Sequence, residues 1–313
     1  MSTVAKRPLG DSGLGVSTVG LGCNNFGRRV DLDGTRAVVD AALESGVTFF
    51  DTADIYGTGQ SEELLGKALE GRRDEVVLAT KFGMDMHDGK GPRGSRDYIR
   101  QAVEASLRRL GTDVIDFYWY HRPDGETPIA ETLGALDELV RAGTVRAIGA
   151  SNFSAAQIDE ADGAAREQGL TRFSAIQNEY SLLVREAEDD VLPACRRLGL
   201  GFVPFFPLAS GLLTGKYGRG EQGPAGARLS GRDQIATDEQ FALVDSLSEY
   251  ASERDLSLLD VAIGALLARE EVSSVIAGAT RPDQVRSNAA AAAWSPSAAD
   301  LKSLASVLAA RAG

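Results

Sequence analysis

The chain has 313 residues, of which 43% are hydrophobic and 25% are charged, and these values exclude intrinsically disordered and fibrous proteins. Acidic residues outnumber basic ones by 45 to 33, and the net charge of -12 disfavours nucleic acid or an anionic membrane as the main partner. The two cysteines and two histidines fit neither a zinc site nor a disulfide framework, and no apolar run resembles a signal peptide or a membrane span. We therefore expect a soluble, cytoplasmic protein without a bound metal ion.

Apolar runs of strand length alternate with segments of helical periodicity, after a short hairpin that is expected to turn at residues 10–13. The predicted strands are residues 19–21, 48–50, 76–80, 114–120, 145–150, 175–177, 201–205 and 274–277. The predicted helices are residues 33–45, 61–69, 99–110, 129–140, 155–168, 190–198, 241–252 and 258–269, followed by helices that begin near residues 282 and 298.

Eight successive strand-then-helix units predict the fold class α/β, as a closed parallel (β/α)8 barrel, or TIM barrel, formed by residues 1–313 as a single domain. The strands are continuous apolar runs, as is typical of parallel strands that are covered on both faces. A doubly wound sheet is the competing fold, but the residues after the first strand do not form a glycine-rich nucleotide-binding turn. The formal GxGxxG at residues 89–94 lies well past its strand and contains a proline, so we interpret it as a flexible loop.

The residues that follow seven of the predicted strands lie at the end of the barrel where catalytic groups are found, and five of these seven positions carry groups that can ionise or hydrogen-bond. The residues at these positions are Asp51, Lys81, His121, Ser151 with Asn152, Gln177, Phe205 and Gly278. Asp51 and Lys81 end neighbouring strands and are expected to pair, while Tyr56 folds back toward them from the loop after Asp51. An adjacent ammonium stabilises a phenolate, so Lys81 is expected to lower the pKa of Tyr56 and make it a proton donor. His121 is placed to hydrogen-bond the same substrate oxygen.

Each of these side chains also has an ordinary structural explanation when it is taken alone. Asp51 is able to cap a turn, Tyr56 to pack in the core, and His121 to serve a structural role. The occurrence of all of these residues together at or near strand ends is what favours a catalytic role for them. A further alternative is that Lys81 forms a Schiff base, as in a barrel aldolase, but a paired Asp51 disfavours this role because it keeps the amine protonated.

Seven stretches of the chain resemble the aldo-keto reductase family, and together they cover essentially its whole length. They are GVTFFDTADIYGTGQSEELLGKAL, VVLATKFG, FYWYHRPD, VRAIGASNFS, IQNEYSLL, PLASGLLTGKY and SSVIAGATRPDQVRSN. The resemblance implies a catalytic tetrad of Asp51, Tyr56, Lys81 and His121, with Tyr56 as the general acid in reduction.

The resemblance also implies a binding site for a nicotinamide cofactor. By it, Ser151, Asn152 and Gln177 bind the nicotinamide carboxamide, and Phe205 stacks on the ring. The residues implied for the pyrophosphate loop are Leu208, Ser210 and Lys216, and those implied for the adenosine end are Gly278, Thr280, Arg281, Gln284 and Asn288.

The chain departs from the family pattern at two positions of this cofactor site. Phe205 stands where tyrosine is common, which keeps the aromatic face and loses only a hydroxyl. Gly278 and Ala279 replace a Lys-Ser pair, so a 2′-phosphate would depend more heavily on Arg281. We expect NADPH (NADP+) as the cofactor, with NADH possible.

The resemblance implies NADPH-dependent reduction of aldehydes or ketones to alcohols, with a small carbonyl compound as the partner and with no metal ion. The alternative is a cofactor-binding regulatory subunit that resembles the potassium-channel β-subunits. Residues 25–26, 82–94 and 122–126 are expected to choose the substrate, and the sequence identifies neither that substrate nor the oligomeric state.

Overall fold

The computed structural model describes residues 4–219, 223–224, 228–230 and 235–309, and its centre is one parallel sheet of eight strands. The strands are β3 (Val19–Gly22), β4 (Phe49–Asp51), β5 (Val77–Phe82), β6 (Ile115–Tyr120), β7 (Val145–Ser151), β8 (Ala175–Gln177), β9 (Gly201–Phe202) and β10 (Val275–Gly278). Each strand pairs with the next one in the chain, and β10 pairs with β3.

Hydrogen bonds between the chain segments around β9 and β10, the two outermost strands, close this sheet into a barrel. The amide of Phe202 donates to the carbonyl of Glu271 at 2.7 Å, and the amide of Ser273 donates back to Phe202 at 2.9 Å. Further along, Ile276 donates to the carbonyl of Pro204 at 3.3 Å. The predicted (β/α)8 barrel is therefore confirmed.

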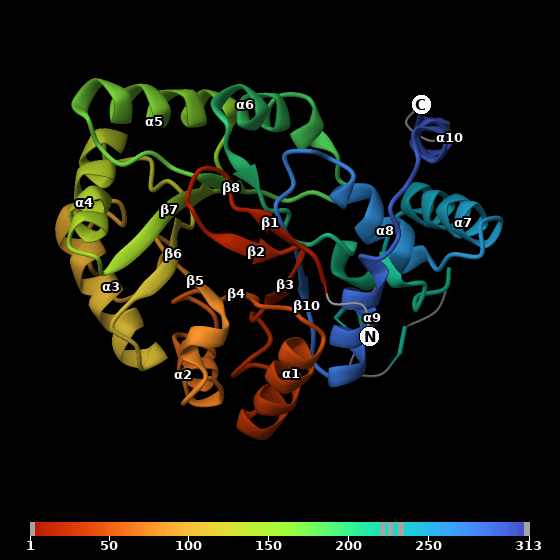
Figure 1. The fold of residues 1–313 in the computed structure, drawn as a ribbon, viewed down its shortest axis with the longest axis horizontal. Helices are drawn as coiled ribbons and strands as arrows, with labels where there is room; N and C mark the ends of the chain where they lie inside the picture. The colour runs from red at the N-terminus through yellow and green to blue at the C-terminus, as the bar shows by residue number, and fades with distance from the viewer. Residues whose placement is uncertain (1–3, 220–222, 225–227, 231–234, 310–313) are drawn as a thin grey trace.

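A ring of helices surrounds the barrel (Figure 1). In chain order these are α1 (Leu32–Glu44), α2 (Gln60–Ala68), α3 (Arg96–Leu110), α4 (Ile129–Arg141), α5 (Ala155–Gln168), α6 (Val191–Leu198), α8 (Leu258–Leu267) and α9 (Pro282–Ala291). Two more helices, α7 (Asp238–Ser252) and α10 (Ala298–Ala309), pack together on the outer side of α8. The 3-10 turns are η1 (Arg73–Glu75), η2 (Glu186–Glu188) and η3 (Ala209–Thr214). Within the described ranges, no helix combines the length and the apolar character that crossing a bilayer requires.

Several strands extend beyond the apolar runs that predicted them. Asp51, Lys81 and Ser151 are the last or next-to-last residues of their strands rather than the first residues of loops. Their side chains are consequently held by the strand backbone, which positions them more firmly than a loop would. Strand β9 is shorter than predicted, because Pro204 has no amide hydrogen to continue the ladder.

The N-terminal hairpin of β1 (Lys6–Pro8) and β2 (Gly15–Ser17) lies across the end of the barrel opposite the strand carboxyl ends (Figure 1). Leu9 and Val16 of this hairpin are fully buried and join the cluster of side chains that fills the barrel interior. The hairpin therefore seals one end of the barrel, and the other end is left to form a site.

The hairpin turn gives a test of how tightly this seal is packed. Gly10 and Gly13 both have positive φ, +55° and +75°, but a Cβ on Gly10 would lie 1.9 Å from the Ser174 carbonyl oxygen, whereas one on Gly13 would meet nothing within 4 Å. Gly13→Ala should cost only the ~1 to 2 kcal/mol of a left-handed residue. Gly10→Ala should cost at least ~3 kcal/mol, because the Ser174 backbone has to move. Urea unfolding of both variants measures the difference, and equal costs would contradict this packing.

Candidate active site

A cavity of about 690 Å³ opens at the carboxyl ends of the strands. Its wall includes side chains from nearly every strand end, among them Asp51 of β4, Ser151 of β7 and Gln177 of β8. His121, directly after β6, and Tyr56, on the loop between β4 and α2, complete one side of it.

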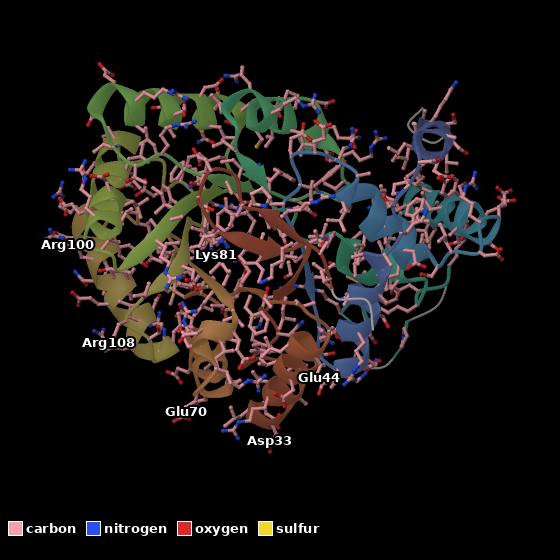
Figure 2. The ribbon with its side chains drawn as sticks, viewed as in Figure 1. Asp33, Glu44, Glu70, Lys81, Arg100 and Arg108 are labelled. Carbon is pink, nitrogen blue, oxygen red and sulfur yellow. The ribbon has the colours of Figure 1, made fainter. Side chains whose placement is uncertain are left out.

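The deepest feature beside this cavity is an ion pair between Lys81 and Asp51, whose side chains are only 1% and 4% exposed. The Lys81 ammonium donates to Asp51 Oδ2 and, at 2.8 Å, to the carbonyl oxygen of Thr52. Burial by itself would lower the pKa of Lys81, but the charges of Asp51 and Tyr56 and the hydrogen bonds to both side chains together outweigh burial and raise it. Lys81 is therefore a fixed ammonium, and Figure 2 shows it in the middle of the molecule, whereas Asp33, Glu70 and Arg108 lie at the rim.

The Tyr56 hydroxyl lies 3.5 Å from the Lys81 ammonium, and this contact connects the ion pair to the cavity. Burial raises the pKa of Tyr56 above its ordinary value, and the opposing charge of Lys81 only partly offsets that rise. The expected net decrease of the Tyr56 pKa is therefore wrong, because the free energy lost when a phenolate is removed from water exceeds the free energy gained from its attraction to one ammonium. Tyr56 is held as a protonated phenol.

The His121 ring packs edge-on against Tyr56, with 5.9 Å between the ring centroids. Burial, followed by the charges of Lys81 and Arg122, lowers the pKa of His121 well below its ordinary value, so the imidazole is neutral near pH 7. Its Nδ1 atom is buried without a hydrogen-bond partner among the described residues. The other ring nitrogen, Nε2, is the one available to a molecule in the cavity.

Three uncharged side chains form an amide-rich wall next to this group. Gln177 Nε2 donates to Asp51 Oδ1 at 3.0 Å, and Asn152 Nδ2 donates to the His121 carbonyl at 2.9 Å and to Ser151 Oγ at 3.1 Å. Asn152 has a positive φ of 60°, an uncommon conformation that asparagine tolerates better than most residues. These bonds leave the side-chain carbonyl oxygens of Asn152 and Gln177 to accept from a ligand.

The opposite end of the cavity is strongly basic. Burial and the charges of Arg29 and Arg281 lower the pKa of Lys216, which places three cations within electrostatic range of one another. Arg281 is also paired with Asp283, with N–O distances of 3.1 Å. An arrangement of this kind suits phosphate groups, since their negative charge would relieve the repulsion among the cations.

A strained segment lies between the amide-rich wall and the basic end. Phe206, Ala209 and Ser210 all have positive φ, of 53°, 44° and 58°, and they lie close to Phe205 and Leu208 on the cavity wall. Backbone strain of this kind is concentrated at ligand sites, where the surrounding structure enforces it.

The cavity wall contains all of the residues predicted for the site except Lys81, which lies behind Asp51. Those on the wall are Asp51, Tyr56, His121, Ser151, Asn152, Gln177, Phe205, Leu208, Ser210, Lys216, Gly278, Thr280, Arg281, Gln284 and Asn288. Of the expected substrate segments, Asn25, Met84 and Arg122 also line the cavity, but Phe26 and Phe82 are fully buried in the core instead.

Among the wall residues that the sequence reasoning missed are four with long polar or charged side chains: Asn24, Arg28, Arg29 and Arg228. The Arg28-Arg29 pair follows the first barrel strand in an acidic chain, and this was the one local signal that could have found two of them. Nothing local to Asn24 or Arg228 indicated their position.

A second layer of buried charge lies outside the barrel strands, behind Tyr56. Glu62 of α2 is fully buried, and it accepts from Thr80 at 2.6 Å and from Arg109 Nε at 2.7 Å. Asp54 is also buried, and its Oδ1 atom has no hydrogen-bond partner in the described ranges. Burial and the neighbouring charge of Glu62 raise the pKa of Asp54 to about 7.

Comparisons with known proteins agree with this architecture. The model of the Aldo/keto reductase family matches residues 18–309. A probable voltage-gated potassium channel subunit beta from Arabidopsis thaliana is 36% identical over 298 residues, which cover 90% of this chain and 89% of the relative. A protein of the same description from Oryza sativa subsp. japonica is 37% identical with the same coverage.

Asp54 gives a pH-dependent prediction about stability. Its folded-state pKa of about 7 lies above the unfolded value of ~3.9, so the folded protein binds the proton more tightly and the free energy of unfolding falls as pH rises from ~4 to ~7. Asp54→Asn removes this loss, on the order of 2 to 4 kcal/mol above pH 7. In urea unfolding, the free energy of unfolding of the variant minus that of wild type should therefore be larger at pH 8 than at pH 5. Asp33→Asn, at an exposed carboxylate, is the control, and an Asp54→Asn effect that is the same at both pH values would contradict the prediction.

Proposed function

The chain belongs to the aldo/keto reductase family, and from this premise we propose that it is an oxidoreductase that uses NADPH to reduce aldehydes or ketones to alcohols. The observation that carries the proposal is the contact of Tyr56 with the buried Lys81–Asp51 pair, beside a neutral His121, at the wall of one large cavity. A general acid, a charge that supports it and a neutral hydrogen-bond donor meet there.

The side chains of the cavity fit a nicotinamide dinucleotide at both of its ends. The amide-rich wall of Ser151, Asn152 and Gln177 offers partners for a carboxamide, and Lys216 and Arg281 offer charge for phosphates. A bound nicotinamide supplies the hydride for such a reduction.

In the proposed reaction, the Tyr56 hydroxyl donates its proton to the substrate carbonyl oxygen as negative charge develops there. The raised pKa of Tyr56 does not prevent this step, because an alkoxide is a much stronger base than a phenolate and takes the proton even from a weak acid. The Lys81 ammonium stabilises the phenolate that remains. His121 Nε2 donates a second hydrogen bond to the same oxygen, which a neutral imidazole is able to do.

The Asp51–Lys81 pair supports this role for Lys81 rather than that of a Schiff-base lysine. A nucleophilic lysine has to lose its proton, and the contact with Asp51 raises the pKa of Lys81 instead. In the proposed enzyme, Asp51 orients Lys81 and keeps it charged, and Gln177 holds the second oxygen of Asp51.

The preference for NADPH over NADH rests on Arg281 together with two cations that come from distant parts of the chain, Arg29 and Lys216. A 2′-phosphate adds close to two negative charges, and an acidic protein repels them unless cationic side chains line the binding site. NADH lacks that group and is proposed as the weaker cofactor. We further propose that residues 1–313 form one domain and, since the two cysteines are free thiols, that the protein works in a reducing compartment such as the cytoplasm.

A second candidate function is that of a regulatory subunit, because relatives in two plants are described as probable potassium channel β-subunits. The intact arrangement around Tyr56 does not separate the two candidates, since fold and cofactor binding alone do not establish turnover. Repeated oxidation of NADPH in the presence of a carbonyl compound would favour the reductase. Binding of the cofactor without turnover, together with copurification of a channel protein, would favour the subunit.

Tyr56→Phe tests the general acid directly. We expect kcat/KM for aldehyde reduction to fall by about 100-fold or more, because proton donation acts in the transition state, while the Kd for NADPH stays nearly unchanged. Tyr118→Phe is the matched control, since it removes a buried hydroxyl that has no hydrogen-bond partner in the described part of the chain. A Tyr56→Phe variant within a few-fold of wild type would remove Tyr56 from the mechanism.

Arg281→Ala tests the cofactor preference. Binding of NADPH, measured by fluorescence titration, should weaken by roughly tenfold, as expected for the loss of one charge-assisted contact, whereas binding of NADH should change little. Arg286 lies on α9, the helix that Arg281 precedes, and Arg286→Ala breaks an exposed pair with Glu44 of α1, so this variant is the control for the loss of a surface charge. Equal weakening of NADPH and NADH would refute the role of Arg281 at the 2′-phosphate.

A further inference from the structure

The cavity has a charge that contrasts with the rest of the protein. Among the residues that the structure describes, six cationic side chains line it: Arg28, Arg29, Arg122, Lys216, Arg228 and Arg281. Asp51 is the one carboxylate on the described wall, and its oxygens are already engaged by Lys81 and Gln177. A cavity so rich in positive charge, in a chain whose net charge is -12, is suited to anionic ligands.

The cations do not all lie at the same end of the cavity. Lys216, Arg29 and Arg281 influence one another and form the basic end, where the cofactor phosphates would lie. Arg122 instead follows His121 in the chain, and its charge helps to lower the pKa of His121. Arg122 is therefore at the reacting end, where a nicotinamide carries no phosphate to neutralise it.

Arg122 is exposed, and it has no ion pair or hydrogen bond within the described ranges. It also lines a neighbouring hollow together with Glu179, Glu186 and Asp190, but none of these carboxylates lies within ion-pair distance of its guanidinium. The apolar side chains of Ile55 and Met84 line the main cavity as well, and they can contact the carbon frame of a substrate.

We propose that Arg122 binds a carboxylate on the carbonyl substrate, so that the preferred substrates of this site are aldehydes or ketones that carry a carboxylate group. The inference rests on the reductase function proposed above and deepens it. The planar guanidinium matches the two oxygens of a carboxylate, and a single positive charge balances a single negative one. A phosphate group carries nearly twice that charge and would need a second cation at the same place.

Arg122 also has a simpler explanation, in which its charge acts only on His121 or on the developing oxyanion. That role would affect charged and neutral substrates equally. The ratio of kcat/KM for a carboxylate substrate to kcat/KM for its neutral ester separates the two roles, because effects on the reaction centre cancel in the ratio.

The kinetic test compares 4-carboxybenzaldehyde with methyl 4-formylbenzoate, followed by NADPH absorbance. Wild type should favour the carboxylate by at least about tenfold, Arg122→Gln should lose most of that preference, and Arg122→Lys should retain part of it. The preference should also shrink as salt is added, because Arg122 is exposed to solvent. Arg108→Gln, which removes the same charge at the outer rim of α3, should keep the full ratio (Figure 2).

A wild-type ratio near or below one would overturn the inference. An Arg122→Gln variant in which kcat/KM falls by the same factor for the carboxylate and for the ester would overturn it as well. Calorimetric binding of 4-(hydroxymethyl)benzoate and of its methyl ester, with NADP+ present, gives the same comparison without turnover. The acid should bind at least about tenfold more tightly, and Arg122→Gln should remove the difference. Equal binding of acid and ester would overturn the inference, whereas selective binding with no reduction of either aldehyde would support Arg122 and refute only the reductase function.

Discussion

The buried ion pair between Asp51 and Lys81 is the constraint on which the mouth of the barrel depends. Two charges with side chains 4% and 1% exposed would cost several kcal/mol each if they were left without partners. The carbonyl of Thr52 and the amide of Gln177 supply the remaining hydrogen bonds. These contacts connect Asp51 of β4, Lys81 of β5 and Gln177 of β8. A shift in the register of any of these strands would therefore also change the geometry of the site.

The same electrostatics extend outward from the pair in two directions. Toward the helices, the fully buried Glu62 pairs with Arg109. Burial and then the charge of Glu62 raise the pKa of Asp54, and the charges of Arg109 and Lys81 only partly offset that rise. Toward the cavity, burial and then the charges of Lys81 and Arg122 lower the pKa of His121 and keep it neutral. An acidic surface and a basic cavity therefore coexist in one chain, because the arginines of the loops gather at the open end of the barrel.

Much of the fold was predictable because the local signals agree with the global one. Each strand is an apolar run, each run is followed by a helical pattern, and eight such units favour a closed barrel. Strand ends were less predictable, since Asp51 and Lys81 are polar yet continue their strands, which only their mutual pairing makes tolerable. Strand β9 is short because Pro204 has no amide hydrogen and because Phe202 already bonds to Glu271 and Ser273 where the barrel closes.

The sequence by itself determined which chemical groups lie at the barrel mouth, because the apolar runs show where each strand ends, and five of the seven residues at those ends are polar. The tertiary structure alone decided how those groups behave. The pKa of Tyr56 is raised rather than lowered, since desolvation depends on everything that packs around the hydroxyl and not on Lys81 alone. Likewise, Arg29 lies near Lys216 and Arg281 because the pairing of β10 with β3 brings the loop after β3 beside the loops after β9 and β10. No local stretch of the chain encodes this proximity of residues that are far apart in sequence.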